Sequence, residues 1–121
     1  MGSPGPVRVR RIYEEPASDD GQRILVDRLW PRGVSKERAA LAEWLRDVAP
    51  STALRQWYQH DPDKLTEFAR RYEEELRDPE RAAALAHLRD LAAAGPLTLL
   101  TASHGGDISH AAVLQRLLTS S

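Results

Sequence analysis

The sequence predicts a single α/β domain in which a small mixed sheet of about three strands packs with about five helices. Three observations lead to this fold class. Strand-like runs occur near both ends of the chain, amphipathic helical patterns fill its middle, and one more helical pattern closes it. The 121 residues fit one domain of the commonest size. We assign residues 7–121 to this domain and residues 1–6 to a flexible leader or an expression remnant.

Two short apolar runs predict the first two strands. Val7, Val9 and Tyr13 are interleaved with arginines, as in an edge strand. Asp19-Asp20-Gly21 is a turn signal in front of a second strand over residues 23–30. We therefore expect the two strands to form a hairpin or to lie close together.

Four amphipathic helical patterns follow the second strand. Each begins at a residue that can cap a helix, namely Ser35, Ser51, Asp61 or Asp78. A proline directly follows each of the two aspartates, which is a favoured arrangement in the first turn of a helix. Gly95-Pro96 ends the fourth pattern, so the middle of the chain is predicted to be helical.

The chain then supplies a strand, a loop and a closing helix. Residues 97–102 read as a buried strand and residues 111–118 as an amphipathic helix. The long helical connection favours parallel pairing of the last two strands. Ligands bind beyond the carboxyl ends of such strands, so we expect residues 30–33 and residues 104–110 to meet on one rim of the sheet.

The composition excludes several classes of protein. The chain has no cysteine, which rules out a disulfide framework, a thiolate nucleophile and a cysteine-ligated metal. It carries neither a secretion signal nor an apolar run of membrane-spanning length, so we expect a cytoplasmic protein with no membrane partner. The formal net charge of −1 provides no general attraction to nucleic acid. An interaction module that uses Arg8, Arg10 and Arg11 to meet nucleic acid or an acidic protein is the last-ranked alternative.

The first candidate site is the run Asp27-Arg28-Leu29-Trp30-Pro31-Arg32-Gly33, where charges interrupt a predicted buried strand. Charges in a sheet interior are costly unless they are paired or used. Asp27 could orient Arg28, Arg32 could hold an anionic group, and Gly33 would let the backbone approach closely. The alternative is an internal acid–arginine pair that only ties the strand to a helix.

The second candidate site lies between two predicted helices. Arg55 and His60 stand near the end of one helix and the start of the next, where both could face a shared cleft. Asp61 is close enough in sequence to orient the imidazole. The alternative explains Asp61 by helix capping alone and His60 as part of a polar linker.

The third candidate site is the loop before the closing helix. Glycines between a buried strand and a helix N-terminus can cradle an anion with backbone N–H groups, which here points to Gly105, Gly106 and Ser109. The alternative is that Asp107 or Ser109 only caps the helix.

The same loop also allows a metal-binding hypothesis. His104, Asp107 and His110 recur at three-residue intervals and could hold a divalent metal ion if the loop curls. Histidines from among His60, His104 and His110 could instead ligate haem. A metal- or haem-binding protein is therefore the competing class.

Our leading hypothesis is a cleft that binds a small anionic or polar ligand. The arginine guanidinium is a fixed fork that matches carboxylates and phosphates. His60 or His110 would transfer a proton if there is chemistry, and the sequence leaves ligand identity, catalysis and oligomeric state open. The proposed ligand-binding residues are Asp27, Arg28, Arg32, Gly33, Arg55, Gly105, Gly106, Ser109 and His110.

With these residues laid out, the chain resembles the YeaO-like proteins, a bacterial family of unknown function. The resemblance runs from about Val7 to Leu118 and implies a compact α/β fold. In the family pattern His110 is matched, whereas relatives commonly carry lysine, arginine or a similar polar residue in place of His104. This departure weakens the hypothesis of a metal site shared by the family and leaves room for one peculiar to this protein. The segments that carry the resemblance include Arg11-Ile12-Tyr13, residues 20–33, Ala49-Pro50-Ser51, Leu97-Thr98-Leu99-Leu100 and His110-Ala111.

Overall fold

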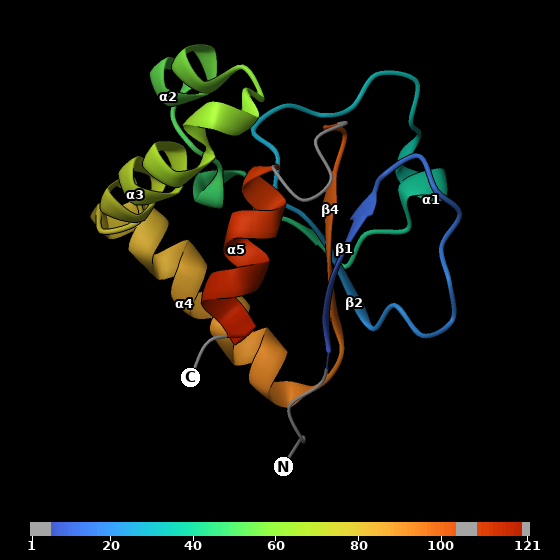
Figure 1. Cartoon of the computed structure of the whole chain (residues 1–121). Helices are drawn as coiled ribbons and strands as arrows, with labels where there is room; N and C mark the ends of the chain where they lie inside the picture. The colour runs from blue at the N-terminus through green and yellow to red at the C-terminus, as the bar shows by residue number, and fades with distance from the viewer. Residues whose placement is uncertain (1–5, 104–108, 120–121) are drawn as a thin grey trace.

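The computed structural model of the chain describes residues 6–103 and 109–119 (Figure 1). It confirms a single α/β domain with five α-helices in this part of the chain. The strands are β1 (Val7–Arg11), β2 (Gln22–Leu25), β3 (Glu43–Trp44) and β4 (Leu97–Thr101). The α-helices are α1 (Lys36–Ala39), α2 (Thr52–Tyr58), α3 (Leu65–Glu75), α4 (Pro79–Ala94) and α5 (His110–Thr119), with short 3₁₀ helices η1 (Arg46–Val48) and η2 (Pro62–Lys64).

The four strands form one parallel sheet in the order β1-β4-β2-β3. The prediction of a mixed sheet of about three strands is therefore wrong. The predicted hairpin is also wrong, because β4 lies between β1 and β2. Parallel pairing of β2 with β4 and the edge position of β1 are confirmed. All five residues of β4 are buried, as expected for a central parallel strand that is covered on both faces.

The strand β3 was missed because its neighbours imitate a helical pattern. The helix predicted to start after Ser35 is only one turn long, since Ala40 leaves it in a left-handed conformation with φ of 49°. The following residues pair with β2, and Leu45 N–H donates to the Leu25 carbonyl at 2.8 Å. Trp44 and Leu45 pack against different hydrophobic clusters, which is the alternation of a strand.

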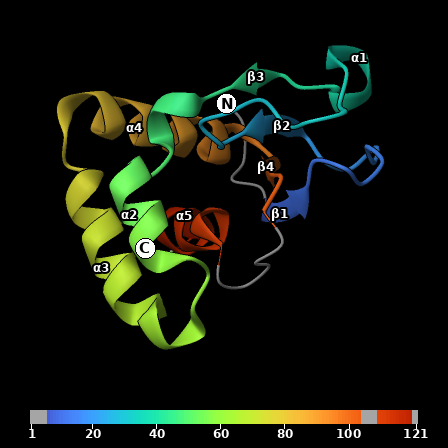
Figure 2. The ribbon, with the colours of Figure 1, turned by 90° about the horizontal axis from the view of Figure 1, so that it is seen from above.

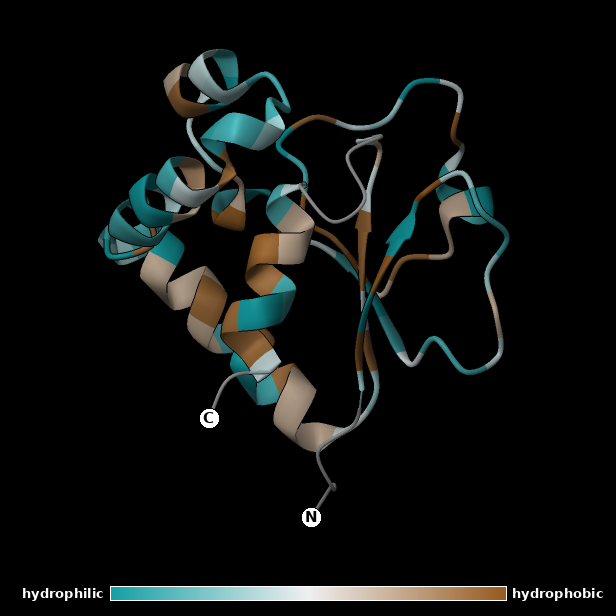
Figure 3. Ribbon diagram, in the orientation of Figure 1, coloured by the Kyte–Doolittle hydropathy of each residue, from teal (hydrophilic) through white to brown (hydrophobic). Residues whose placement is uncertain are grey.

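The sheet separates two hydrophobic clusters of unequal size. Helices α2 to α5 lie on one side of it and α1 on the other (Figures 1 and 2). Ile24 and Leu99 belong to the larger cluster, whereas their neighbours Leu25 and Leu100 belong to the smaller one. Figure 3 shows apolar residues concentrated in β4 and α5. Of the helices in residues 6–103 and 109–119, none has the length and apolar character needed to cross a membrane.

Gly21 is required at the turn that leads into β2. It has φ of +65°, and a Cβ atom there would lie 2.2 Å from the Pro96 carbonyl oxygen. That oxygen accepts a hydrogen bond from Gln22 N–H at 3.1 Å, so it is held in place. Gly33 has a similar φ of +76°, but a Cβ atom there would meet nothing within 4 Å.

We expect Gly21→Ala to lower the free energy of unfolding by about 2 kcal/mol or more, because it adds a backbone clash to the left-handed strain. Gly33→Ala is the matched control and should cost only about 1 kcal/mol, from the strain alone. Urea denaturation of the two variants checks the difference. Equal losses would contradict the role given to the Pro96 contact.

Candidate functional site

A cavity of about 440 Å³ opens beyond the carboxyl ends of β2 and β4. Three parts of the chain line it: residues 27–32 after β2, side chains between residues 49 and 68, and residues 101–103 together with His110. Tyr13, which follows β1, also contributes to the lining. This is the position in which parallel α/β sheets bind ligands.

Six of the residues singled out in the sequence line this one cavity. They are Asp27, Arg28, Arg32, Arg55, His60 and His110. They come from three separate segments that the parallel connections bring together.

The other predicted residues do not contribute to the lining described here. Gly33 is exposed and lies outside the lining, and Ser109 is buried at the start of α5, where its hydroxyl accepts a hydrogen bond from Ala112 N–H at 3.2 Å. Ser109 therefore acts as a helix cap. The remaining predicted residues, His104, Gly105, Gly106 and Asp107, lie outside the described residues.

Asp27 is the polar centre of the cavity. It follows the end of β2, which stops at Leu25 rather than continuing to residue 30 as predicted. Its carboxylate accepts hydrogen bonds from the Thr101 hydroxyl at 2.7 Å and from Ala102 N–H at 2.8 Å. The acid is thereby tied to the end of β4.

His110 completes this polar centre from the first turn of α5. Its Nε2 atom lies 3.2 Å from Asp27 Oδ1 and 3.1 Å from the Val26 carbonyl oxygen. Both neighbours are hydrogen-bond acceptors, so Nε2 must carry a proton. The expectation that Asp27 orients Arg28 or pairs with another arginine is wrong: in the described part of the chain, its carboxylate is engaged by Thr101, Ala102 and His110.

The surroundings of Asp27 favour its ionised form. Burial by itself would raise the pKa of this carboxyl group. The hydrogen bond and the positive charge of His110 act in the opposite direction, together with the donors Ala102 and Thr101. The net result is a pKa below the ordinary value, so Asp27 is an anion at neutral pH.

Arg28, Arg32 and Arg55 give the mouth of the cavity a positive character. All three are exposed, and within residues 6–103 and 109–119 none of their side chains forms an ion pair. Among the described lining residues, Asp27 is the only acid, so the arginines outnumber the carboxylates. This excess is local, because the chain as a whole carries a formal net charge of −1.

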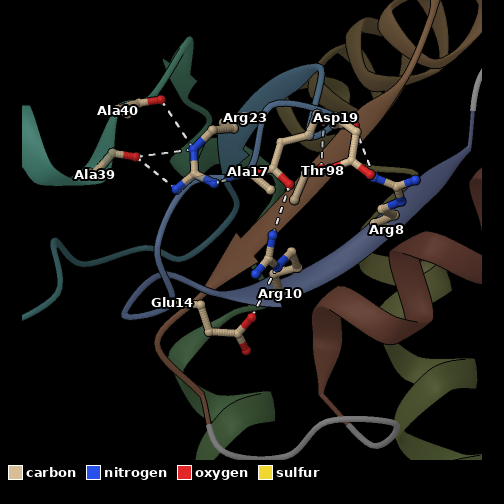
Figure 4. Close-up of polar contacts among 10 residues, drawn as sticks. Arg8, Arg10, Glu14, Ala17, Asp19, Arg23, Ala39, Ala40 and Thr98 are labelled. Carbon is tan, nitrogen blue, oxygen red and sulfur yellow. Dashed lines mark hydrogen bonds and ion pairs between the residues drawn. The ribbon is translucent and has the colours of Figure 1, made fainter.

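The arginines of β1, by contrast, have partners, and Figure 4 shows those of Arg8 and Arg10. Arg8 pairs with Asp19 at 2.9 Å, and Arg10 pairs with Glu14 at 3.0 Å. Arg11 donates to the Ala102 carbonyl oxygen at 3.4 Å. The positive charge of Arg8 and Arg10 is therefore balanced locally.

His60 and Ser103 form a second polar pair in the lining. The Ser103 hydroxyl lies 2.6 Å from His60 Nε2. His60 has φ of 54°, and the preceding Gln59 has φ of 47°, so two successive residues without a glycine adopt left-handed conformations after α2. A hydroxyl bonded to an imidazole is an arrangement from which a nucleophile or a proton relay can be built.

The described residues give no support to a metal centre. Within them, no group of three or more histidine, aspartate or glutamate side chains is placed to hold a metal ion. The Nε2 atom of His110 faces two acceptors and therefore has no lone pair to offer. The proposed set of His104, Asp107 and His110 depends on residues outside the described part.

Sequence reasoning did not find Thr101 and Ser103 as site residues. The available signal was their place at the carboxyl end of the predicted buried strand, where polar residues follow an apolar run. The lining residues Tyr58 and Phe68 fall within the amphipathic helical patterns that begin at Ser51 and Asp61, and both are buried. Nothing in a helical pattern indicates that part of such a residue faces a cavity.

Comparison with known sequences places this fold in a family. A family profile described as the inactive DUF488-N3 subclade matches residues 6–121. No solved structure shows significant similarity to the chain.

Bacterial relatives match almost the whole chain. Uncharacterized proteins of Mycobacterium tuberculosis H37Rv and Mycobacterium bovis are each 52% identical over 112 residues, which is 93% of this chain and 92% of the relative. The uncharacterized protein YeaO of Escherichia coli K12 is 39% identical over 114 residues, covering 94% of this chain and 97% of YeaO. The chain therefore belongs to the YeaO-like family, in the inactive DUF488-N3 subclade.

Proposed function

We propose that this protein is a cytoplasmic ligand-binding protein whose cavity at the carboxyl ends of β2 and β4 holds a small anionic ligand. The observation that carries the proposal is the set of three exposed arginines at the cavity, which have no acidic partner among residues 6–103 and 109–119. Guanidinium groups without an internal partner are available to phosphate or carboxylate oxygens.

The polar centre of the cavity gives the ligand a fixed environment. Asp27 is held by Thr101 and Ala102, and His110 is oriented by Asp27 and Val26. Such a preorganised network reduces the ordering cost of binding. Asp27 also disfavours an anionic group beside itself, so the charged group of the ligand belongs near the arginines.

The proposal is for binding rather than turnover. The family profile carries the word inactive in its description, which favours binding over catalysis. If there is chemistry, His60 with Ser103 and His110 with Asp27 are the groups able to move a proton.

The double variant Arg32→Ala/Arg55→Ala tests the proposal. We expect inorganic phosphate, sulfate or citrate to raise the melting temperature of the wild-type protein at low ionic strength. In the double variant the affinity for these anions should fall by about 100-fold, because two charge-assisted hydrogen bonds to the anion are lost. Thermal denaturation with increasing anion concentration measures the effect.

A matched control separates the site from the general loss of charge. Arg77 and Arg89 are exposed, lie outside the cavity and form no ion pair within the described residues. Arg77→Ala/Arg89→Ala removes the same charge and should leave the response to anions unchanged. Equal behaviour of the two double variants, both folded by circular dichroism, would rule out an anion site at this cavity.

A further inference from the structure

The cavity has two chemically different parts. Arg28, Arg32 and Arg55 are exposed and form its outer part. Its inner wall includes the buried residues Tyr58 and Phe68, whose rings stack with centroids 4.0 Å apart. A ligand that fills the cavity must therefore combine an anionic group with an uncharged organic part.

Further apolar residues extend this inner wall. Ala49 and Pro50 are buried and line the same cavity, as does the buried Pro31. At the mouth, the side chain of Leu29 lines the cavity while the residue is 68% exposed. Large exposed apolar side chains are few in the described residues, and one beside a cavity can gain contact area when an organic ligand binds.

The volume of the cavity agrees with an organic ligand. About 440 Å³ lies in the range of about 300–1,000 Å³ that is usual for small-molecule sites. An inorganic phosphate ion bound by the arginines would leave the exposed apolar side chains of Tyr13 and Leu29 in contact with water. An attached ring or chain would cover these side chains and displace the water.

The charges set the direction of binding and the nature of the anionic group. The ionised Asp27 lies at the polar centre and repels an anion, so the charged group stays with the arginines. Three guanidinium groups suit a phosphate dianion, which has more charge and more acceptor oxygens than a carboxylate.

We propose that the cavity binds a phosphate monoester of an apolar organic group. The phosphate contacts Arg28, Arg32 and Arg55, and the organic group packs against the exposed apolar side chains of Tyr13 and Leu29. This inference rests on the proposed anion-binding function and adds the chemical class of the ligand to it.

Isothermal titration calorimetry with three small probes tests the inference. The probes are phenyl phosphate, which has both parts, inorganic phosphate, which has only the anionic part, and phenol, which has only the ring. We expect phenyl phosphate to bind at least about ten-fold more tightly than inorganic phosphate, because its ring is buried. Phenol should bind far more weakly than either.

Two variants assign the parts of the probe to the parts of the cavity. Arg32→Ala/Arg55→Ala should weaken the binding of phenyl phosphate and of inorganic phosphate by the same factor. Leu29→Ala is a surface change that leaves the core intact. It should lower the affinity for phenyl phosphate about three-fold and leave the affinity for inorganic phosphate unchanged. Inorganic phosphate is thus the internal control for the folding of this variant.

The outcomes separate the inference from the function on which it rests. If phenyl phosphate and inorganic phosphate bind equally and both need the arginines, the phosphate-monoester assignment is wrong and the anion site stands. If phenol binds as tightly as phenyl phosphate, the assignment is also wrong. If neither phosphate compound binds, the assignment is wrong, and if sulfate and citrate also leave the melting temperature unchanged, the proposed function fails as well.

Discussion

Asp20→Ala is expected to lower the free energy of unfolding by about 3–5 kcal/mol, because it leaves a buried guanidinium without its carboxylate. Asp20 is 1% exposed, and its carboxylate lies 2.5 Å from the guanidinium of Arg23, whose side chain is 7% exposed. Removing one partner of such a pair is far more costly than replacing both, since the remaining charge is desolvated and uncompensated.

The other contacts of this pair explain why its loss should affect more than one segment. Asp20 also accepts hydrogen bonds from Ala17 N–H at 2.9 Å and from Arg10 at 3.1 Å. Arg23 donates to the carbonyl oxygens of Ala39 and Ala40 at the end of α1 (Figure 4). The pair thus connects β1, the turn before β2 and α1.

Urea denaturation at pH 7 measures this effect, and Asp19→Ala is its matched control. Asp19 is the adjacent acid, but its side chain is 68% exposed and its partner Arg8 is also exposed. A surface pair of this kind contributes only about 0–1 kcal/mol. A loss of less than about 1 kcal/mol for Asp20→Ala would contradict the structural role of the buried pair.

The sequence predicted the elements of this fold better than their arrangement. The apolar run at Leu97–Leu100 correctly indicated a buried strand, and its parallel pairing with β2 followed from the long helical connection. Its central position could not be predicted, because pairing between distant strands depends on packing rather than on local pattern. The arginines of β1 marked it as an edge strand, yet the turn signal at residues 19–21 suggested a hairpin that the sheet does not contain.

The site shows the same division between local and long-range information. The unusual charges of residues 27–33 led to the cavity, because charged side chains at the end of a buried strand require an explanation in any fold. The partners of Asp27 were not predictable. Thr101, Ala102 and His110 lie 74 or more residues away in sequence, and only the parallel crossover brings them beside β2.

Asp27→Ala is expected to lower the free energy of unfolding by about 3 kcal/mol at pH 7. The change leaves Ala102 N–H and the Thr101 hydroxyl without their acceptor and removes the anionic neighbour of His110. Hydrogen bonds to a charged group contribute about 1.5–3 kcal/mol each, and relaxation around the small side chain offsets part of the loss. Asp27→Asn keeps one acceptor oxygen and should lose less than Asp27→Ala.

The same interactions predict how the difference in free energy of unfolding between the wild type and Asp27→Ala depends on pH. Folding lowers the pKa of Asp27 below its ordinary value of 3.8, so between the two pKa values the unfolded chain binds more protons than the folded one. The stability that Asp27 contributes is therefore present above the ordinary value and is lost as the pH falls through the lower pKa of the folded state. The gap between wild type and Asp27→Ala should narrow as urea denaturation is repeated at progressively more acid pH.

The matched control for this titration is Asp90→Ala, since Asp90 is exposed on α4 and forms no ion pair within residues 6–103 and 109–119. The free energy of unfolding of Asp90→Ala should stay close to that of the wild type throughout the acid range. The carboxyl group of Asp20, whose pKa is also lowered, titrates in all of these proteins and cancels from the comparison. A gap between wild type and Asp27→Ala that is the same in acid as at pH 7 would show that Asp27 contributes through packing, and its place as the charged centre of the cavity would have to be abandoned.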